Sequence, residues 1–277
     1  MRTSVALAAR PGFAVSAVTC RDDHTGWSEA ETHTGYRVVL VNRGRFRRMA
    51  DGLTETVDPT MAYLGVPGEE QRFSHPAGGD VCTLVNLTPR LWRTLAGDIA
   101  RPARTAIYVD ARLHLAHRRF LAATGRGPVR PGNADHDYAL AEELLRLLAV
   151  ALEQVAPGPT PAGERASRDD RTLVTRAREA IAADHPAAGG LFPLAELLDV
   201  SPYRLSRAFS RELGVSLTRY RNRVRVGRAL DRLEAGETSL GLLAADLGFA
   251  DHAHLTRTVR DQLGRTPTAL RRLLAHG

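Results

Sequence analysis

The chain has 277 residues, of which 43% are hydrophobic and 25% are charged, and it carries a formal net charge of +7. This composition is typical of a water-soluble protein large enough for two domains with separate cores. It excludes a membrane-spanning protein, because charged residues interrupt the most apolar long segment, residues 139–155. The N-terminal run SVALAA is too short for a signal-peptide core. We therefore expect a cytoplasmic protein with no membrane partner.

Short strands are expected in the first part of the chain. Between residues 12 and 110, apolar and β-branched runs alternate with Gly, Pro, Asn and Asp. The runs are residues 13–20, 36–44, 61–68, 80–88 and 105–110. Strands at this spacing predict a sandwich or a small barrel.

Two amphipathic helices are expected after these strands, at residues 110–124 and 137–155. The second helix carries one apolar stripe, formed by Leu140, Leu144, Leu147, Leu148, Ala151 and Val155. Such a stripe serves either as a dimer surface or as a cap on the helix's own barrel, and both interpretations stay open at this point.

The segment VAPGPTPAGERASRDD, residues 155–170, contains three Pro and two Gly and has no apolar periodicity. This composition is typical of a linker. We place a β-rich N-terminal domain at residues 1–156, a linker at 157–169 and an all-α C-terminal domain at 170–277. The predicted fold class is therefore α+β.

One short pattern occurs twice in the helical domain. LSRAFSRELGVSLT, residues 205–218, returns fifty residues later as LTRTVRDQLGRTPT, residues 255–268. Each copy follows a short helix and a turn, which is the helix-turn-helix arrangement whose second helix enters the major groove. On a helical wheel the leucines of each copy face inward, whereas Arg207 and Arg257 face outward. A connecting helix of roughly eighteen residues, about 27 Å long, would hold the two second helices about one DNA turn apart.

Positive charge gathers in the same domain. Residues 165–277 hold 19 Arg against 13 Asp and Glu, a formal +6, whereas residues 1–164 carry a formal +1. All 38 basic residues are Arg, and Arg makes planar two-point contacts to phosphate and to guanine. We therefore expect a polyanionic partner, double-stranded DNA. A solvated Arg-rich face and a helical repeat for protein binding are the alternatives.

A longer set of positions extends the repeat over residues 170–275. They are Ser201, Leu205, Arg207, Phe209, Gly214, Ser216, Tyr220, Arg225, Ala229, Gly248, Phe249, Leu255, Arg257, Gly264, Thr266 and Pro267. In register, this set resembles the DNA-binding domain of the AraC family of bacterial transcription regulators. Leu255, Val259 and Leu270 depart from the family pattern, in which aromatic residues are usual, and these departures concern packing rather than groove contact.

The resemblance implies a set of DNA contacts. Base-contacting positions are Tyr203, Ser206 and Arg207 in the first copy, and His252, Ala253, Thr256 and Arg257 in the second. Arg211, Thr218 and the start of the last helix at Thr268 suit phosphates. Promoter DNA is then the main partner, and RNA polymerase is a further expected partner of such an activator.

The β-rich domain resembles the cupin-like sensor and dimerisation domain that precedes this DNA-binding domain in many members. The resemblance rests on the segments VNRGRFRR and GVPGEEQRFSHP and on the two trailing helices. It implies a small-molecule or chemical effector and a homodimer. The competing function is a cupin-type metal-dependent enzyme fused to a DNA-binding domain, but no catalytic motif supports it. We therefore expect a regulator rather than an enzyme.

Four residues of the first domain are candidate metal ligands: Cys20, His33, His75 and Cys82. Two nitrogens and two sulfurs suit zinc or another transition metal. If the strands bring the four residues together, they could also form a thiol-based sensor. No C-x-x-C or H-x-H pair is present. Two buried cysteines with two surface histidines is the alternative, and no cofactor is assigned with certainty.

Overall fold

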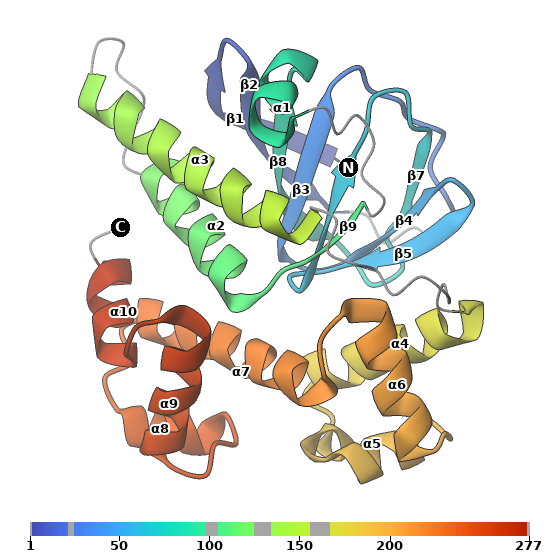
Figure 1. Cartoon of the computed structure of the whole chain (residues 1–277), viewed down its shortest axis with the longest axis vertical. Coiled ribbons are helices and arrows are strands. Elements are labelled where there is room, and N and C mark those ends of the chain that lie inside the picture. The colour runs from blue at the N-terminus through green and yellow to red at the C-terminus, as the bar shows by residue number, and fades with distance from the viewer. Residues whose placement is uncertain (1, 22–24, 98–104, 125–133, 156–166, 276–277) are drawn as a thin grey trace. The chain divides into compact units, whose positions relative to one another are not determined.

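The computed structural model describes residues 2–21, 25–97, 105–124, 134–155 and 167–275 (Figure 1). The chain divides between residues 158 and 159 into a β-rich unit and a helical unit. Most of the predicted linker, 157–169, lies outside the described residues, and the helix α4 (Arg168–Ala182) begins two residues before residue 170, the predicted start of the C-terminal domain. The predicted limits of the domains stay a prediction.

The N-terminal unit contains nine strands and three helices in its described residues. They are β1 (Arg2–Arg10), β2 (Phe13–Cys20), β3 (Tyr36–Arg43), β4 (Phe46–Ala50), β5 (Leu53–Val57), β6 (Met61–Gly65), β7 (Gln71–Ser74), β8 (Asp80–Leu87), α1 (Pro89–Ala96), β9 (Ala106–Tyr108), α2 (Ala111–Thr124) and α3 (Ala134–Val155).

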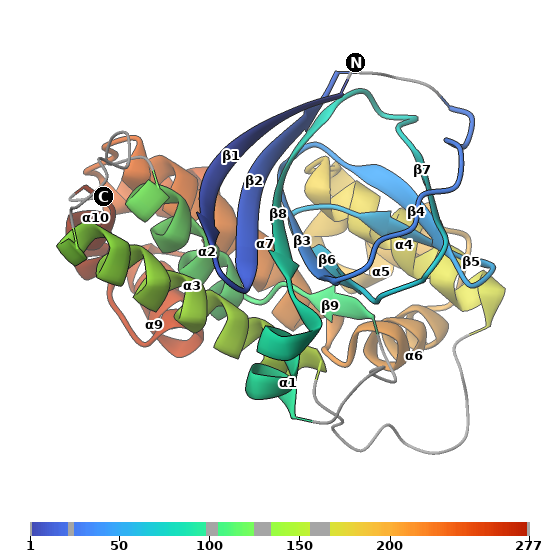
Figure 2. The same cartoon turned by 90° about the horizontal axis from the view of Figure 1, so that it is seen from above.

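The strands form two antiparallel sheets. The larger sheet has the order β1-β2-β8-β3-β6-β9 and the smaller has the order β5-β4-β7. Figure 2 shows the larger sheet curving across the unit, with β7, β4 and β5 on its concave side. Because side chains alternate along a strand, Val38 and Leu40 of β3 pack in one core while Val39 and Val41 pack in another. Burial of both faces explains why this strand reads as a continuous apolar run.

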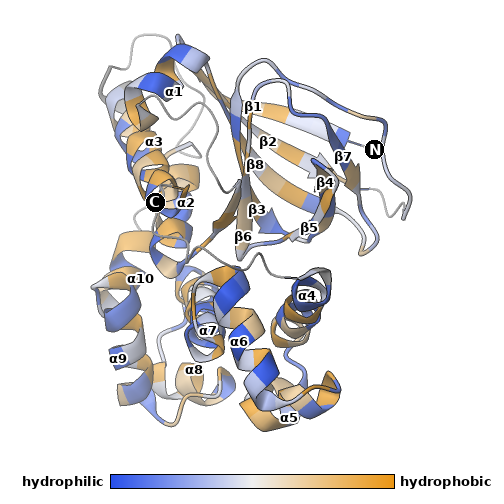
Figure 3. Cartoon of the chain, turned by 45° about the vertical axis from the view of Figure 1, so that its right-hand side comes forward, coloured by the Kyte–Doolittle hydropathy of each residue, from blue (hydrophilic) through white to orange (hydrophobic). Residues whose placement is uncertain are grey.

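The helices cover the other face of the larger sheet. Trp92 of α1 stacks on Tyr36 of β3, with ring centroids 4.3 Å apart. The apolar stripe predicted on α3 is buried in this same core, together with Leu113 and Phe120 of α2. The stripe of α3 therefore packs on its own sheet, and the hydrophobic residues are visible along that helix in Figure 3. The exposed side chains Tyr138 and Leu145 lie outside this core.

Several elements of this unit are missing from the sequence prediction: β1, β4, β5, β7 and α1. The three strands of the smaller sheet are four or five residues long and carry charged side chains. One charge points inward, because Arg48 of β4 is only 2% exposed. Its Nη2 donates to Glu69 Oε2 at 2.6 Å, and its guanidinium lies 4.3 Å from the centroid of the Tyr63 ring. Because Arg48 is buried in an ion pair with Glu69, the sequence of β4 lacks the alternation of buried apolar and exposed polar residues that is typical of a strand.

The C-terminal unit is helical throughout its described residues. Its elements are α4 (Arg168–Ala182), a 3-10 helix (Pro186–Gly189), α5 (Leu191–Leu197), α6 (Pro202–Leu213), α7 (Leu217–Glu234), α8 (Leu240–Asp246), α9 (His252–Leu263) and α10 (Pro267–Ala275). The α+β fold class, with a β-rich body, trailing helices and a helical second part, is confirmed. Within the described residues, no helix has the length and apolar character needed to cross a bilayer.

Candidate nucleic-acid interface and inner cavity

The helical unit contains two helix-turn-helix pairs, α5 with α6 and α8 with α9, joined by α7 (Figure 1). Each pair makes its turn through one residue with positive φ, Asp199 at 55° in the first and Gly248 at 69° in the second. The amide of the next residue then donates back into the short helix, Val200 to Ala195 and Phe249 to Ala244. The two pairs therefore share one turn geometry, which precedes the repeated segments 205–218 and 255–268.

The second helix of the first pair, α6, begins and ends where local chemistry predicts. Ser201 Oγ accepts a hydrogen bond from the Arg204 amide at 3.2 Å, which caps the N-terminus. Gly214, with φ of 70°, closes the C-terminus. Leu205 and Phe209 are fully buried, and the Phe209 ring meets Tyr220 of α7 edge-on with centroids 5.1 Å apart.

The second pair repeats this construction with different residues. Asp251 caps α9 by accepting from the His254 amide at 2.6 Å, and Gly264 closes it with φ of 67°. Leu255 and Val259 are fully buried in place of the usual aromatics, whereas Leu263 is only half-buried. The inward and outward faces predicted for both helices are thus largely those observed.

The residues expected to contact DNA lie on the outer faces or at helix starts. Five are exposed: Tyr203, Arg207, Thr218, His252 and Arg257. Five are half-buried: Ser206, Arg211, Ala253, Thr256 and Thr268.

Three of these side chains, Tyr203, Arg207 and Arg211, already have partners in the protein. Arg207 Nη1 donates to the Tyr203 hydroxyl at 2.8 Å, and its guanidinium lies 5.5 Å from the centroid of that ring. The pair, one turn apart on α6, forms a preorganised group on the outer face. Arg211 Nη1 lies 3.4 Å from Asp170 Oδ2 on α4, so a phosphate would compete with this carboxylate for Arg211.

The arginines between residues 204 and 228 are not all directed to the surface. Arg223 is buried, and Arg225 lies 5.4 Å from the centroid of the Phe249 ring. Arg228 Nη2 donates to the Ala182 carbonyl at 2.9 Å, at the C-terminal end of α4. Arg225 and Arg228 therefore contact neighbouring segments of the same unit, so their charges do not add to a DNA-binding face.

Part of the C-terminal unit matches a known protein family. Residues 194–273 match the family described as "Helix-turn-helix domain". These residues, within the C-terminal unit, form a helix-turn-helix domain of the AraC type. The match starts within α5 and ends within α10, so it includes both pairs and the connecting helix α7.

Two relatives of the chain are named as regulators. It is 30% identical over 138 residues to the transcriptional activator RhrA of Rhizobium meliloti, covering 48% of this chain and 40% of that protein. It is 21% identical over 142 residues to the Msm operon regulatory protein of Streptococcus mutans, covering 51% of this chain and 50% of that protein. The chain thus spans half or less of these relatives. A solved structure similar to part of this chain is the C-terminal domain of AraT, a response regulator from Geobacillus stearothermophilus, with 28% identity, a TM-score of 0.35, and coverage of 40% of this chain and 88% of that one.

The N-terminal unit contains a partly open cavity of about 160 Å³, lined by residues of both sheets. Its apolar lining comes from Val18, Val39, Phe46, Tyr63, Phe73 and Leu84. Its polar lining comes from Arg2, Cys20, Ser28, Glu31, Arg37, His75, Asp80 and Cys82.

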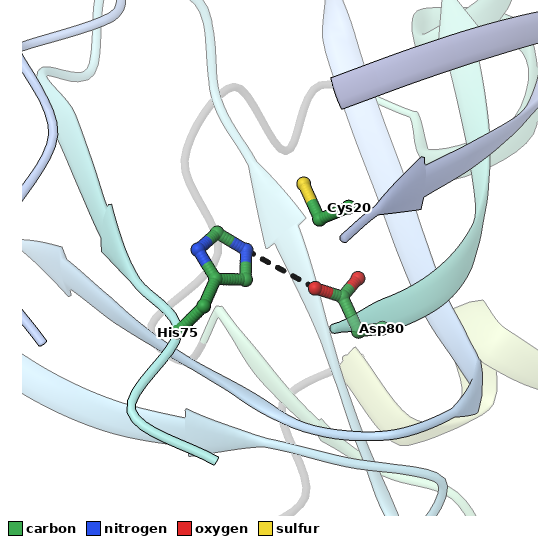
Figure 4. A group of neighbouring side chains, drawn as sticks. All are labelled: Cys20, His75 and Asp80. Atoms are coloured by element: carbon green, nitrogen blue, oxygen red, sulfur yellow. Dashed lines mark ion pairs between the residues drawn. The ribbon is translucent and has the colours of Figure 1, made fainter. Parts of the chain in front are cut away.

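Three side chains with metal-ligating atoms meet at this cavity. Cys20 ends β2, Asp80 begins β8 and is its cross-strand partner, and His75 follows β7 of the smaller sheet (Figure 4). One donor atom from each lies within 4.8 Å of the other two. His75 Nε2 is 3.1 Å from Asp80 Oδ1, and the Cys82 thiol donates to Asp80 Oδ2 at 2.8 Å.

The structure brings together two of the four predicted ligands, Cys20 and His75. Cys82 lines the cavity but is not part of this group, and its thiol donates to Asp80. His33 is engaged elsewhere: its Nδ1 lies 2.6 Å from the Gly35 carbonyl and its Nε2 lies 3.1 Å from Gln71 Nε2. Both ring nitrogens of His33 are thus occupied, and it does not line the cavity. Asp80, which sequence reasoning missed, takes its place beside Cys20 and His75. The available signal was its position two residues before Cys82, which puts both on one face of a strand.

The two thiols differ in environment. Cys20 is half-buried, and burial together with the Asp80 carboxylate raises its pKa. Cys82 is buried, and burial, again with Asp80, raises its pKa strongly. Both therefore stay protonated at neutral pH in the absence of a cation, which argues against a reactive thiolate switch at either position.

Proposed function

We propose that the chain is a sequence-specific, DNA-binding transcription regulator whose N-terminal unit receives a chemical signal. The observation that carries the proposal is the presence of two helix-turn-helix pairs, each with an arginine on the exposed face of its second helix. A repeat built only for packing has no need of an exposed arginine at the same position of both copies. The AraC-type match over both pairs supports the same function.

Direct base reading is proposed for the outer face of α6 and, more weakly, of α9. Tyr203, Arg207 and Ser206 offer ring, guanidinium and hydroxyl groups to base edges, and a guanidinium reads guanine through two parallel hydrogen bonds. Ala253 on α9 offers only an apolar contact, for example to a thymine methyl group. Thr218 and Thr268, at the starts of α7 and α10, suit phosphates.

The regulatory part of the proposed function belongs to the N-terminal unit, which contains the cavity. A small effector bound there would act on promoter DNA through the AraC-type domain, without catalysis, in the cytoplasm. Activation through RNA polymerase fits a relative named as a transcriptional activator. We also propose that the chain forms a homodimer. The exposed Tyr138 and Leu145 of α3 provide apolar area for contact with a second copy.

Selection from a random duplex library tests the proposal without knowledge of the operator. Full-length protein, challenged with competitor DNA, is expected to enrich one motif. A nonspecific nucleic-acid binder would instead give no enriched motif, and its affinity would follow salt concentration with the slope expected from phosphate contacts alone. That second outcome contradicts the proposal.

A further inference from the structure

The cavity wall formed by Cys20, His75 and Asp80 has the donor atoms of a metal centre. We propose that these three side chains bind a borderline divalent cation of the zinc class, and that this ion is the signal, or part of the signal, that the regulator receives. Occupation of the site is independent of DNA binding, whereas its role as a signal rests on the proposed function.

The fold brings the three groups together from distant parts of the chain. Cys20 and Asp80 are sixty residues apart but are directly paired on neighbouring strands. Gly79 permits this approach, because a Cβ at that position would lie 2.2 Å from the Cys20 carbonyl oxygen. His75 reaches the pair from the opposite sheet. The cluster therefore spans the two sheets, at a place where an ion would tie them together.

Charge balance favours a cation at this point. The Asp80 side chain is 3% exposed, and a buried carboxylate requires a compensating positive group. The cavity's arginines are directed to other groups: Arg2 pairs with Glu31 at 3.0 Å, and Arg37 donates to Asn86 at 3.0 Å. A divalent ion held by one thiolate, one carboxylate and one neutral imidazole leaves no net charge.

The donor set selects the class of ion. Sulfur, imidazole nitrogen and carboxylate oxygen are together typical ligands of zinc and its neighbours. Magnesium and calcium prefer oxygen ligands alone. Binding releases the Cys20 thiol proton to solvent and forms a sulfur–metal bond. Because the cavity has room for several water molecules, the ion can also take water or a small ligand as a further donor.

Cobalt titration of the full-length protein tests the site, since Co²⁺ is the spectroscopic probe for zinc sites. After chelator treatment, the wild-type protein is expected to bind one Co²⁺ per chain. A near-ultraviolet sulfur-to-cobalt band should appear, and Zn²⁺ should remove it whereas Mg²⁺ should not. Absence of this band in folded wild-type protein overturns the proposal.

Matched substitutions identify the ligands. Cys20→Ser should abolish the sulfur band, and His75→Gln and Asp80→Asn should weaken Co²⁺ binding beyond the roughly 10- to 100-fold typical for an outer partner of a metal site. His33→Gln is the control histidine and should leave the band unchanged. Cys82→Ser should keep the band, because its thiol only orients Asp80. Retention of the band in Cys20→Ser, or its loss in His33→Gln with retention in His75→Gln, contradicts the assignment.

Two further measurements complete the test. The first identifies the ligands in wild-type protein, in case the variants fail to fold, and the second tests whether the ion acts as a signal. X-ray absorption of the wild-type zinc complex should show one sulfur neighbour, and none or two would overturn the ligand set. Affinity for a selected duplex should change when zinc is removed by chelation. Unchanged affinity with intact cobalt binding would remove the signalling role but keep the site. Loss of all sequence preference, with or without zinc, would instead refute the proposed function.

Discussion

Replacement of Arg207 by alanine should weaken binding to a selected duplex far more than binding to unrelated DNA. Arg207 lies on the exposed face of α6, where its Nη1 donates to the Tyr203 hydroxyl and its guanidinium rests over that ring. Tyr203 itself is 68% exposed. The two side chains support each other at the surface, so the guanidinium loses little conformational freedom when it meets a base.

The expected loss follows from the type of contact. A two-point hydrogen bond between arginine and guanine contributes about 1–3 kcal/mol of discrimination, which corresponds to an increase in Kd of about 5- to 150-fold. Arg207→Lys keeps the charge but loses the planar fork, so it should lose most of the same discrimination. If Arg207 contacted only a phosphate, the loss would be uniform over all sequences.

Fluorescence anisotropy with the selected duplex and a scrambled duplex, at one fixed salt concentration, measures both effects. Arg176→Ala serves as the control, because Arg176 is an exposed arginine on α4 and its removal changes the net charge equally. Equal weakening on both duplexes by Arg207→Ala, or a loss no greater than that of Arg176→Ala, would refute base reading by this residue.

Three further predictions concern stability, each measured by denaturant unfolding. Gly248→Ala should lower the free energy of unfolding by about 1–3 kcal/mol, because φ there is +69° and a Cβ would lie 2.9 Å from an arginine guanidinium nitrogen. Gly241→Ala, in the helix α8 with open space around it, should instead be neutral or raise it by up to about 1 kcal/mol; equal losses in the two variants would contradict the turn argument. Burial lowers the pKa of His117 to about 3, so the folded protein binds fewer protons than the unfolded chain and stability falls as the pH drops below about 6.5. His117→Gln should reduce that slope by up to about 1.4 kcal/mol per pH unit, and an unchanged slope would show that this imidazole does not titrate as described. Glu69→Ala should cost about 3–5 kcal/mol, because it leaves Arg48 buried beside a single weaker partner at 3.4 Å; a loss below about 1 kcal/mol would contradict the importance of that pair.

Local chemistry explains why the helices of the second unit could be predicted closely. In the sequence, Ser201 and Gly214 predict a helix over residues 202–213, and Asp251 and Gly264 predict one over residues 252–263. These are the limits of α6 and α9 in the structure. Both helices are bounded by an oxygen-bearing N-cap residue and a C-terminal glycine, and these signals act within a few residues of the chain. The apolar face of each helix follows directly from its 3.6-residue period.

The elements and ligands that sequence missed depend on contacts between distant residues. Arg48 is buried in the smaller sheet because it pairs with Glu69, which is 21 residues away in the sequence. Asp80 becomes a neighbour of Cys20 through the register of β2 with β8, which no local pattern encodes. His33 looked equivalent to His75 in the sequence, and only the positions of Gly35 and Gln71 show that its ring is occupied.

The central claim is that both helix-turn-helix pairs of one chain read the same duplex. Hydroxyl-radical footprinting of full-length protein on a selected duplex tests it directly, together with Arg207→Ala and Arg257→Ala variants. Because α7 holds the pairs apart along about 27 Å of helix, wild-type protein should protect two segments about one DNA turn apart on one face. Each variant should weaken a different segment, with the larger effect from Arg207→Ala. A single protected segment, or the same segment lost in both variants, would contradict the claim.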